Sequence, residues 1–325
     1  MRKRHLAAAA AVTISVTAFS QAPAFAADAP SGTLLHQVIS TGQAGWQEPA
    51  GSAGVTQASI TGLPNGSSQL VAVNAKGSLE HDIRFANGSW QGWNTISQPG
   101  VTAENAGIAG MSNGSAQLVE VTSTGVLKHD VRNANGSWQT GGWATPAGST
   151  GITQASITAL PNGSSEIVAV TTTGTLELDV RYANGSWKGW DSISQPGVTV
   201  ANASIAGMPN GSSQFIEVTS TGALEYNALS ANGSWQAGGW TTPAIAADAE
   251  TPISITQASI TALPNGSSQI AVATGSAPGF AVHYANGSWS GWAQLYQRVG
   301  YSMASELSIA GMPNGTSQVI AIAES

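Results

Sequence analysis

The stretch GSLEHDIRFANGSWQGW, residues 77–93, contains the pattern that decides the fold. Residues 79–85 alternate apolar and polar side chains, as a half-buried β-strand does, and Asn-Gly at 87–88 favours a tight β-hairpin turn. The string Asn-Gly-Ser-Trp recurs at successive offsets of 48, 49, 48 and 54 residues, with copies beginning at Asn87, Asn135, Asn184, Asn232 and Asn286. The chain is therefore built from internal repeats.

A second turn signal, Asn-Gly followed by Ser or Thr, also marks each repeat, with copies beginning at Asn65, Asn113, Asn162, Asn210, Asn265 and Asn314. The first complete repeat contains four strand patterns, at residues 58–63, 69–73, 79–85 and 90–96. Four strands in roughly 40–50 residues is the period of a β-propeller blade. The small residues of the first strand suit the propeller axis, where the blades converge.

The two ends of the chain hold complementary parts of one repeat. The last repeat stops after its second strand, at 318–322, while residues 32–38 match 77–83 and Trp46 corresponds to Trp93. We therefore expect an all-β, six-bladed propeller with four-stranded blades, whose N-terminal strands complete the C-terminal blade and close the ring. The predicted domain covers residues 27–325, and its shared blade combines 30–50 with 305–325. An open solenoid would not need complementary half-repeats.

A finer period of two blades predicts pseudo-threefold symmetry. At one first-strand position glutamine alternates with another polar residue, in the order Gln57, Asn105, Gln154, Asn202, Gln257 and Glu306. The spacing within the tryptophan pairs also alternates between Trp-x-x-Trp and Trp-x-x-x-x-Trp. An insertion of about six residues, near 246–252, is expected to form a surface loop.

The first 26 residues have the features of a secretory signal peptide. Arg2, Lys3 and Arg4 precede an apolar stretch at 6–19, and Ala24-Phe25-Ala26 offers a small-residue cleavage site. The apolar stretch is shorter than the roughly 20 residues of a membrane-spanning helix. We expect a secreted, extracellular protein.

Composition excludes several classes of protein. The 325 residues include 39 glycines, no cysteine, 42% hydrophobic and 8% charged residues, which argues against coiled coils and against disorder. Without the three basic residues of the signal peptide, 7 basic and 17 acidic residues leave a net charge of −10. Nucleic acid and membrane insertion are therefore not expected, and neither is a disulfide or a cysteine-based metal site. The sequence does not define an oligomeric state.

The tryptophans are the candidate carbohydrate-binding residues. All 11 fall in the repeat: Trp46, Trp90, Trp93, Trp138, Trp143, Trp187, Trp190, Trp235, Trp240, Trp289 and Trp292. For each ring the alternative to binding is packing between adjacent blades, because tryptophan buries a large area. An exposed ring would instead offer a flat face to the C–H face of a sugar, with nearby Asn, Ser, Thr and Gln as hydrogen-bonding groups.

The positions of the titratable residues mostly indicate structural roles and not binding or catalytic ones. The third-strand position of His36, His81 and His129 also accepts Leu178, Tyr226 and Phe280, which is typical of an apolar core position. Asp82 with Arg84, and their copies Asp130 with Arg132 and Asp179 with Arg181, are expected to form ion pairs, and use in a sugar site is the alternative. Glu120 and Glu217 share one second-strand position; we favour a structural network, and a binding role is the alternative. The Asn-Gly-Ser sequons are explained by turn formation.

Enzyme chemistry is poorly supported by the sequence. Glycoside hydrolysis needs two carboxylates in distinct environments, and such a site should interrupt the repeat. The acids that depart from it, Glu48, Asp191, Asp248 and Glu250, are explained as solvated loop charges. Tyr296, Arg298 and Tyr301 form a further departure, either a specialised site or part of the ring closure. We predict no catalytic residue, no metal and no cofactor.

The phrase Gly-x-Leu-x-His-x-x-Arg followed by Asn-Gly-Ser-Trp-x-Gly-Trp, at residues 77–93, resembles the secreted β-propeller lectins of the tectonin, tachylectin and PLL type, and the resemblance covers 32–325. The hairpin is also similar to the aspartate box of sialidases, with Asn in place of Asp. The resemblance implies binding of monosaccharides, including fucose and O-methylated or N-acetylated sugars, at repeated sites near or between blades. We therefore expect a non-catalytic, multivalent lectin that binds glycans or monosaccharides. The alternatives are a secreted sialidase-like glycoside hydrolase and a protein-binding scaffold.

Overall fold

The computed structural model describes residues 32–39, 45–243, 254–274, 278–295 and 302–324. The predicted signal peptide, the insertion near 246–252 and the group Tyr296, Arg298 and Tyr301 lie outside these ranges. Within them, no helix is long and apolar enough to cross a membrane.

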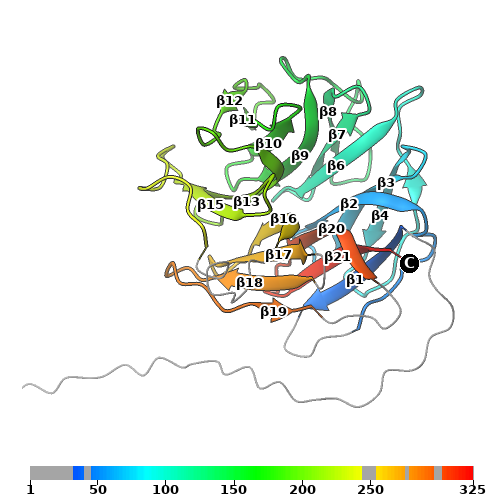
Figure 1. Cartoon of the computed structure of the whole chain (residues 1–325). Helices are drawn as coiled ribbons and strands as arrows, with labels where there is room; N and C mark the ends of the chain where they lie inside the picture. Colours follow the sequence, from blue (N-terminus) through cyan, green and yellow to red (C-terminus); the bar gives the residue numbers. More distant parts are fainter. Residues whose placement is uncertain (1–31, 40–44, 244–253, 275–277, 296–301, 325) are drawn as a thin grey trace, which may run out of the picture.

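The described residues form six antiparallel sheets arranged as blades around a central axis (Figure 1). Blade 1 contains β2 (Val55–Gly62), β3 (Ser68–Asn74), β4 (Leu79–Arg84) and β5 (Asn94–Thr95), and blade 2 contains β6 (Ala103–Gly110), β7 (Ala116–Thr122) and β8 (Leu127–Arg132). Blade 3 contains β9 (Ile152–Ala159), β10 (Ser165–Thr171), β11 (Leu176–Arg181) and β12 (Asp191–Ser192), and blade 4 contains β13 (Val200–Gly207), β14 (Ser213–Thr219) and β15 (Leu224–Leu229). Blade 5 contains β16 (Ile255–Ala262), β17 (Ser268–Thr274), β18 (Gly279–His283) and β19 (Ala293–Gln294), and blade 6 contains β20 (Ser302–Gly311), β21 (Ser317–Glu324) and β1 (Thr33–Ile39). The six-bladed propeller predicted from the repeat is confirmed.

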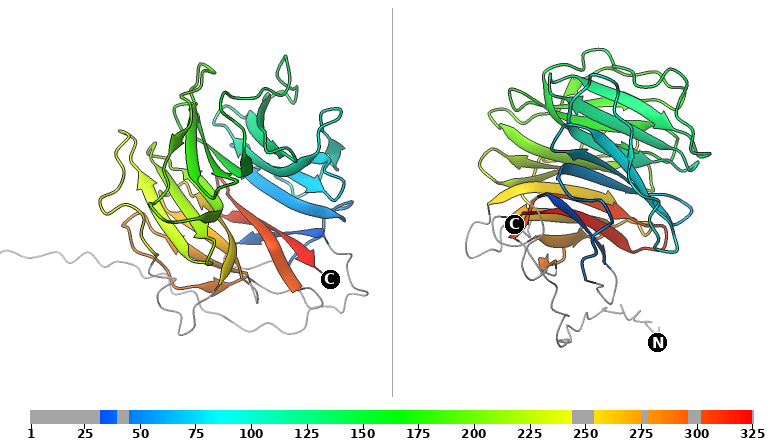
Figure 2. Two further views of the ribbon diagram at one scale, coloured as in Figure 1. Left: turned by 45° about the horizontal axis from the view of Figure 1, so that its top comes forward. Right: turned by 90° about the vertical axis from the view of Figure 1, so that its right-hand side faces the viewer.

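Blade 6 joins the two ends of the chain, as the half-repeats predicted. β1 pairs antiparallel with β21, and its register sets Leu34 opposite Ile322 and His36 opposite Ile320. The three strands β20, β21 and β1 lie side by side in Figure 1, and the turned views of Figure 2 show the same closure. This pairing of the N-terminal strand with the C-terminal strands closes the ring. The two ends of the repeat therefore share one blade, and the ring has no gap between its first and last repeats.

The number of strands in a blade follows the spacing of its tryptophan pair. Blades 1, 3 and 5, which carry Trp-x-x-Trp, have a regular fourth strand. In blades 2 and 4, with Trp-x-x-x-x-Trp, the fourth strand is reduced to single bridges, His129 with Ala144 and Tyr226 with Thr241. The two extra residues between the tryptophans interrupt the ladder, so these blades differ from the uniform four strands that the sequence predicted.

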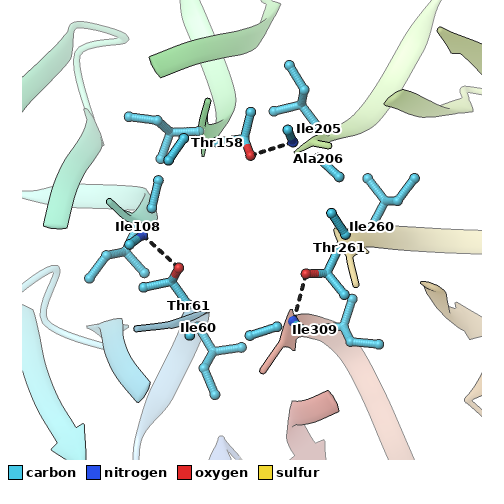
Figure 3. Close-up of a pocket in the computed structure, with 18 residues that line it drawn as sticks. Ile60, Thr61, Ile108, Thr158, Ile205, Ala206, Ile260, Thr261 and Ile309 are labelled. Atoms are coloured by element: carbon cyan, nitrogen blue, oxygen red, sulfur yellow. Dashed lines mark hydrogen bonds between the residues drawn. The ribbon is translucent and has the colours of Figure 1, made fainter. Parts of the chain in front are cut away.

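The inner strands are tied to one another by side chains that replace main-chain pairing. Gln57 donates its side-chain N–H to the Ala106 carbonyl and accepts from the Ala106 N–H, both at 2.9 Å. The Gly110 N–H donates to Thr61 Oγ1 at 2.7 Å, and the equivalent contacts are repeated by Thr158 and Thr261. Figure 3 shows these three threonine contacts around the axis. They recur at alternate interfaces, which confirms the pseudo-threefold symmetry.

The hydrophobic core is divided among the interfaces between blades. Six clusters of buried residues each combine side chains of two adjacent blades. In the interface of blades 1 and 2, for example, Val71 and Leu79 of blade 1 pack with Ile108 and Leu118 of blade 2. The low charge of the chain follows from this arrangement, because most sheet faces are covered by a neighbouring sheet.

The Asn-Gly turns form one face of the propeller, because the turn between the first two strands and the hairpin after the third strand lie at the same end of each blade. In the first turn, Asn65 Oδ1 accepts hydrogen bonds from Ser67 N–H at 3.0 Å and from Ser67 Oγ at 2.5 Å. Gly66 has φ of +81°, a left-handed conformation that favours glycine. We call this end of the molecule the Asn-Gly face.

Candidate functional site

The tryptophans lie mainly between blades. Four of the five pairs pack against a cluster shared by two blades, as Trp90 and Trp93 do between blades 6 and 1, whereas only Trp240 of the fifth pair does so. Trp46 is 8% exposed, and Trp235, at 38%, is the one tryptophan among the exposed large hydrophobic side chains. The remaining rings, which have intermediate exposure, are Trp90, Trp93, Trp138, Trp143, Trp187, Trp190, Trp240, Trp289 and Trp292. Packing therefore accounts for their recurrence, and sugar binding by these rings stays a prediction.

The third-strand histidines occupy the core position that the sequence predicted. His81 is 3% exposed, and its Nε2 lies 3.0 Å from Gln69 Oε1. The imidazole meets the Trp138 indole of the next blade edge-on, with ring centroids 6.1 Å apart. Burial, with a smaller contribution from the Arg132 charge, lowers the pKa of His81 to about 4. These histidines are thus neutral packing groups near pH 7.

The predicted Asp–Arg ion pairs are wrong. Asp82 Oδ1 accepts from the N–H groups of Ile83, at 2.7 Å, and Gly92, at 2.9 Å, so the carboxylate stabilises its own hairpin. Within the described ranges the one ion pair is Lys188 with Asp191. Arg84 is instead half-buried in the groove beside blade 6, where desolvation lowers its pKa. The carboxylate prefers the main-chain donors because they are fixed at hydrogen-bonding distance.

The two second-strand glutamates belong to networks that join a blade to the segment leading into it from the preceding blade. Gln98 donates to Glu120 Oε1 at 2.7 Å, and Lys128 Nζ donates to Gln98 Oε1 at 3.0 Å. Glu217 is fully buried and accepts from Gln195 at 3.1 Å, while its Oε2 has no hydrogen-bond partner. Burial raises the pKa of Glu217 to about 7. These contacts support the structural interpretation favoured from the sequence.

The axis contains a cavity of about 170 Å³ that is lined by few side chains able to bind or react with a ligand. A ring of isoleucines and small residues from all six inner strands lines it, as Figure 3 shows. Deeper along the axis lie the side chains that join the strands, including Gln257, which donates to Glu306 Oε2 at 2.7 Å. Across the described residues, no group of three His, Asp or Glu side chains could hold a metal ion.

A second cavity, of about 180 Å³, opens between blades 3 and 4 on the Asn-Gly face. Blade 3 contributes Glu166, the turn at 160–164 and the end of β11; blade 4 contributes the turn near Ser213 and the hairpin that begins at Leu229. Ser213 Oγ donates a hydrogen bond to Glu166 Oε2. Glu166 is 6% exposed, and burial raises the pKa of its carboxyl, opposed by the Ser213 hydrogen bond and the Lys188 charge.

The cavity exists because the side chain that fills other grooves is absent here. Arg132 stands opposite Ala116 in blade 2, and Leu229 stands opposite Ser213 at the same register position of blade 4. A β-carbon built on Gly136, in the blade 2 hairpin, would lie 3.1 Å from Arg132 Nη2; one built on Gly233 would meet nothing within 4 Å. The arginine-filled grooves are those of Arg84, Arg132 and Arg181. Leucine leaves the guanidinium position open.

Alternate blades each carry one exposed aromatic ring directly after the third strand. Phe85, Tyr182 and Tyr284 are 43%, 42% and 44% exposed and follow the last residue of the third strand in blades 1, 3 and 5. Tyr182 lines the cavity between blades 3 and 4. These rings are not among the residues predicted from the sequence, although the pattern is visible there: Asn133 and Ser230 stand at the same position in blades 2 and 4.

Taken together, the cavity between blades 3 and 4 offers one carboxylate, hydroxyl and amide groups and an aromatic wall. Glu166 is the single carboxylate among its lining residues. Two carboxylates that flank a glycosidic bond, as hydrolysis requires, are therefore not brought together in this cavity. The arrangement suits the binding of a small polar ligand, because a few convergent polar groups beside an apolar surface orient such a molecule.

No known family model matches the chain, and no curated protein matches it in sequence. The fold is nevertheless similar to solved structures. The BP39L lectin from Burkholderia pseudomallei has a TM-score of 0.58 at 19% identity, with 87% of this chain and 83% of that chain covered. The fucose-specific lectin from Aleuria aurantia has a TM-score of 0.58 at 13% identity, with 82% and 87% covered. A third, the Hadza microbial sialidase Hz136, has a TM-score of 0.57 at 10% identity, with 85% and 67% covered. Another structure of the Aleuria lectin is described as a six-bladed β-propeller.

Proposed function

We propose that this protein is a non-catalytic carbohydrate-binding protein whose sites lie in grooves between blades on the Asn-Gly face. The observation that carries the proposal is the cavity between blades 3 and 4, where the exposed Tyr182 ring stands beside Glu166 and the Ser213 hydroxyl. A cavity of about 180 Å³ is smaller than the roughly 300 Å³ and above of drug-sized pockets. A single sugar ring is the ligand that matches this size and mixture of surfaces.

The likeness in fold to lectins, one of them fucose-specific, supports the choice of sugar as ligand. The phrase at residues 77–93 further supports a relationship to the tectonin, tachylectin and PLL type, and the signal-like residues 1–26 support action outside the cell. The likeness to a sialidase extends to the fold, but the cavity with its single carboxylate favours binding over hydrolysis.

The proposal is tested by titrating the folded protein with a panel of monosaccharides and measuring heat or tryptophan fluorescence. At least one sugar should bind, and Tyr182→Ala should weaken that binding about tenfold, since loss of an aromatic contact costs about 1–1.5 kcal/mol. Tyr182→Phe is the matched control and should retain most of the affinity, because it keeps the ring. Failure of every sugar to bind a folded sample would contradict the proposed function.

A further inference from the structure

The groove between blades 3 and 4 differs from the arginine-filled grooves at two positions, and both changes alter its charge in the same direction. Gln117, in β7, occupies the position that Glu166 occupies in β10. Arg181 lines the groove between blades 2 and 3, which contains Gln117. Leu229 lines the groove between blades 3 and 4, which contains Glu166. A neutral amide with a cation has thus been replaced by an acid with an apolar side chain. Formally, this groove changes from one positive to one negative charge.

Among the described residues, Glu166 belongs to no ion pair, and its hydrogen-bond partner is the Ser213 hydroxyl. Lys188, whose charge acts on Glu166 without contacting it, lies on an exposed hairpin and pairs with Asp191 at 2.5 Å. An ionised carboxylate that is 6% exposed is costly unless an opposite charge approaches it.

The open space lies where that opposite charge would fit. In blade 2 the guanidinium of Arg132 lies against the hairpin at Gly136, and in blade 4 the corresponding place beside Gly233 is empty and forms part of the cavity. A ligand cation that entered the cavity would therefore occupy the position of the missing guanidinium. The exposed Tyr182 ring at the rim would contact the rest of the ligand and is also suited to a nearby cation.

We infer that this groove is a site selective for sugars that carry a free, protonated amine, with Glu166 as the partner of the ammonium group and Tyr182 as the wall against which the sugar ring packs. The inference rests on the proposed function and deepens it. Neutral sugars would use the hydroxyl and amide groups of the groove but would leave the Glu166 charge without a counterion. A sugar amine supplies both the charge and the size of the missing side chain.

The test compares glucosamine with N-acetylglucosamine and glucose, which have the same ring without the charged amine. Glucosamine should bind at least about tenfold more tightly than either, with an affinity that falls as salt is added. Glu166→Gln should abolish this preference, and Leu229→Arg should abolish glucosamine binding by filling the cavity. Both variants install residues that other blades already hold, Gln117 and Arg132, so they are expected to fold.

The outcomes separate this inference from the proposed function. If the protein binds neutral sugars but shows no preference for glucosamine, or if Glu166→Gln leaves the preference intact, the amine site is wrong and the lectin function stands. If no sugar binds, the proposed function fails as well. Equal affinity for ethanolamine and glucosamine would overturn the sugar part of the inference, because Tyr182 and the turn residues would then contribute nothing.

Discussion

Glu217 shows how one buried side chain can make the stability of the whole protein depend on pH. Its carboxyl is fully buried, with one oxygen bonded to Gln195 and the other without a partner. In the unfolded chain the carboxyl ionises near its ordinary pKa of about 4.5, whereas in the folded protein it holds its proton up to about pH 7. The folded state therefore binds more protons between these values, and its stability decreases as the pH rises through this window.

Glu217→Gln should remove that loss. At pH 8 the variant should be more stable than the original protein by about 1–3 kcal/mol, and at pH 4.5 the difference should be close to zero. Urea unfolding at the two pH values measures this directly. Glu104→Gln, at an exposed position of β6, is the control and should change the two stabilities equally. An equal gain from Glu217→Gln at both pH values would contradict the assignment.

At the scale of strands and turns, the local sequence is sufficient to predict most of the observed elements. The Asn-Gly signals predicted the turns because the two residues supply what the turn needs locally. The Asn65 side chain accepts a main-chain hydrogen bond within the turn, and Gly66 adopts the left-handed conformation. The alternation in residues 79–85 predicted a strand because Leu79, His81 and Ile83, which share one face, are buried. The ion pairs failed because Asp82 found donors in its own hairpin, which depend on how the chain folds back ten residues later.

The site was harder to predict because its parts come from different blades. Glu166 and Leu229 are 63 residues apart, and neither is unusual by itself; the cavity appears when both stand at one interface. The tryptophans were predicted as binding residues because they recur in every repeat. Recurrence, however, also follows from a repeated packing position. The exposure of Phe85 and Tyr182 depends on the neighbouring blade and is not contained in a single repeat.

β1 is the element on which ring closure depends, and its contribution can be compared with an equivalent strand. Leu34 in β1 and Leu79 in β4 occupy the same position of their blades, and they are 0% and 1% exposed. If the closed ring unfolds as one unit, Leu34→Ala and Leu79→Ala should each cost about 2–5 kcal/mol in urea unfolding. A much smaller cost for Leu34→Ala, with a separate early transition, would show that β1 is attached only weakly.

At the scale of the whole molecule, the pseudo-threefold symmetry determines how the sites face a ligand. Phe85, Tyr182 and Tyr284 occupy equivalent positions in alternate blades, and all three lie on the Asn-Gly face. A surface that displays many copies of a sugar would therefore meet several of these aromatic rings at once. Binding to such a surface gains from the high effective concentration of the second and third sites, whereas binding of a free monosaccharide does not.

This arrangement predicts a difference between surface and solution measurements on aromatic variants. Replacing all three rings, in Phe85→Ala/Tyr182→Ala/Tyr284→Ala, should reduce binding to a densely sugar-coated surface by about 10²-fold or more, since avidity multiplies the separate losses. Tyr284→Ala alone should leave the affinity for free glucosamine unchanged, because that ring lies two blades from Glu166. Surface plasmon resonance at high and low sugar density distinguishes the two effects. If the triple variant and Tyr182→Ala lost the same amount on the dense surface, one groove would account for all the binding, and the propeller would act as a monovalent lectin.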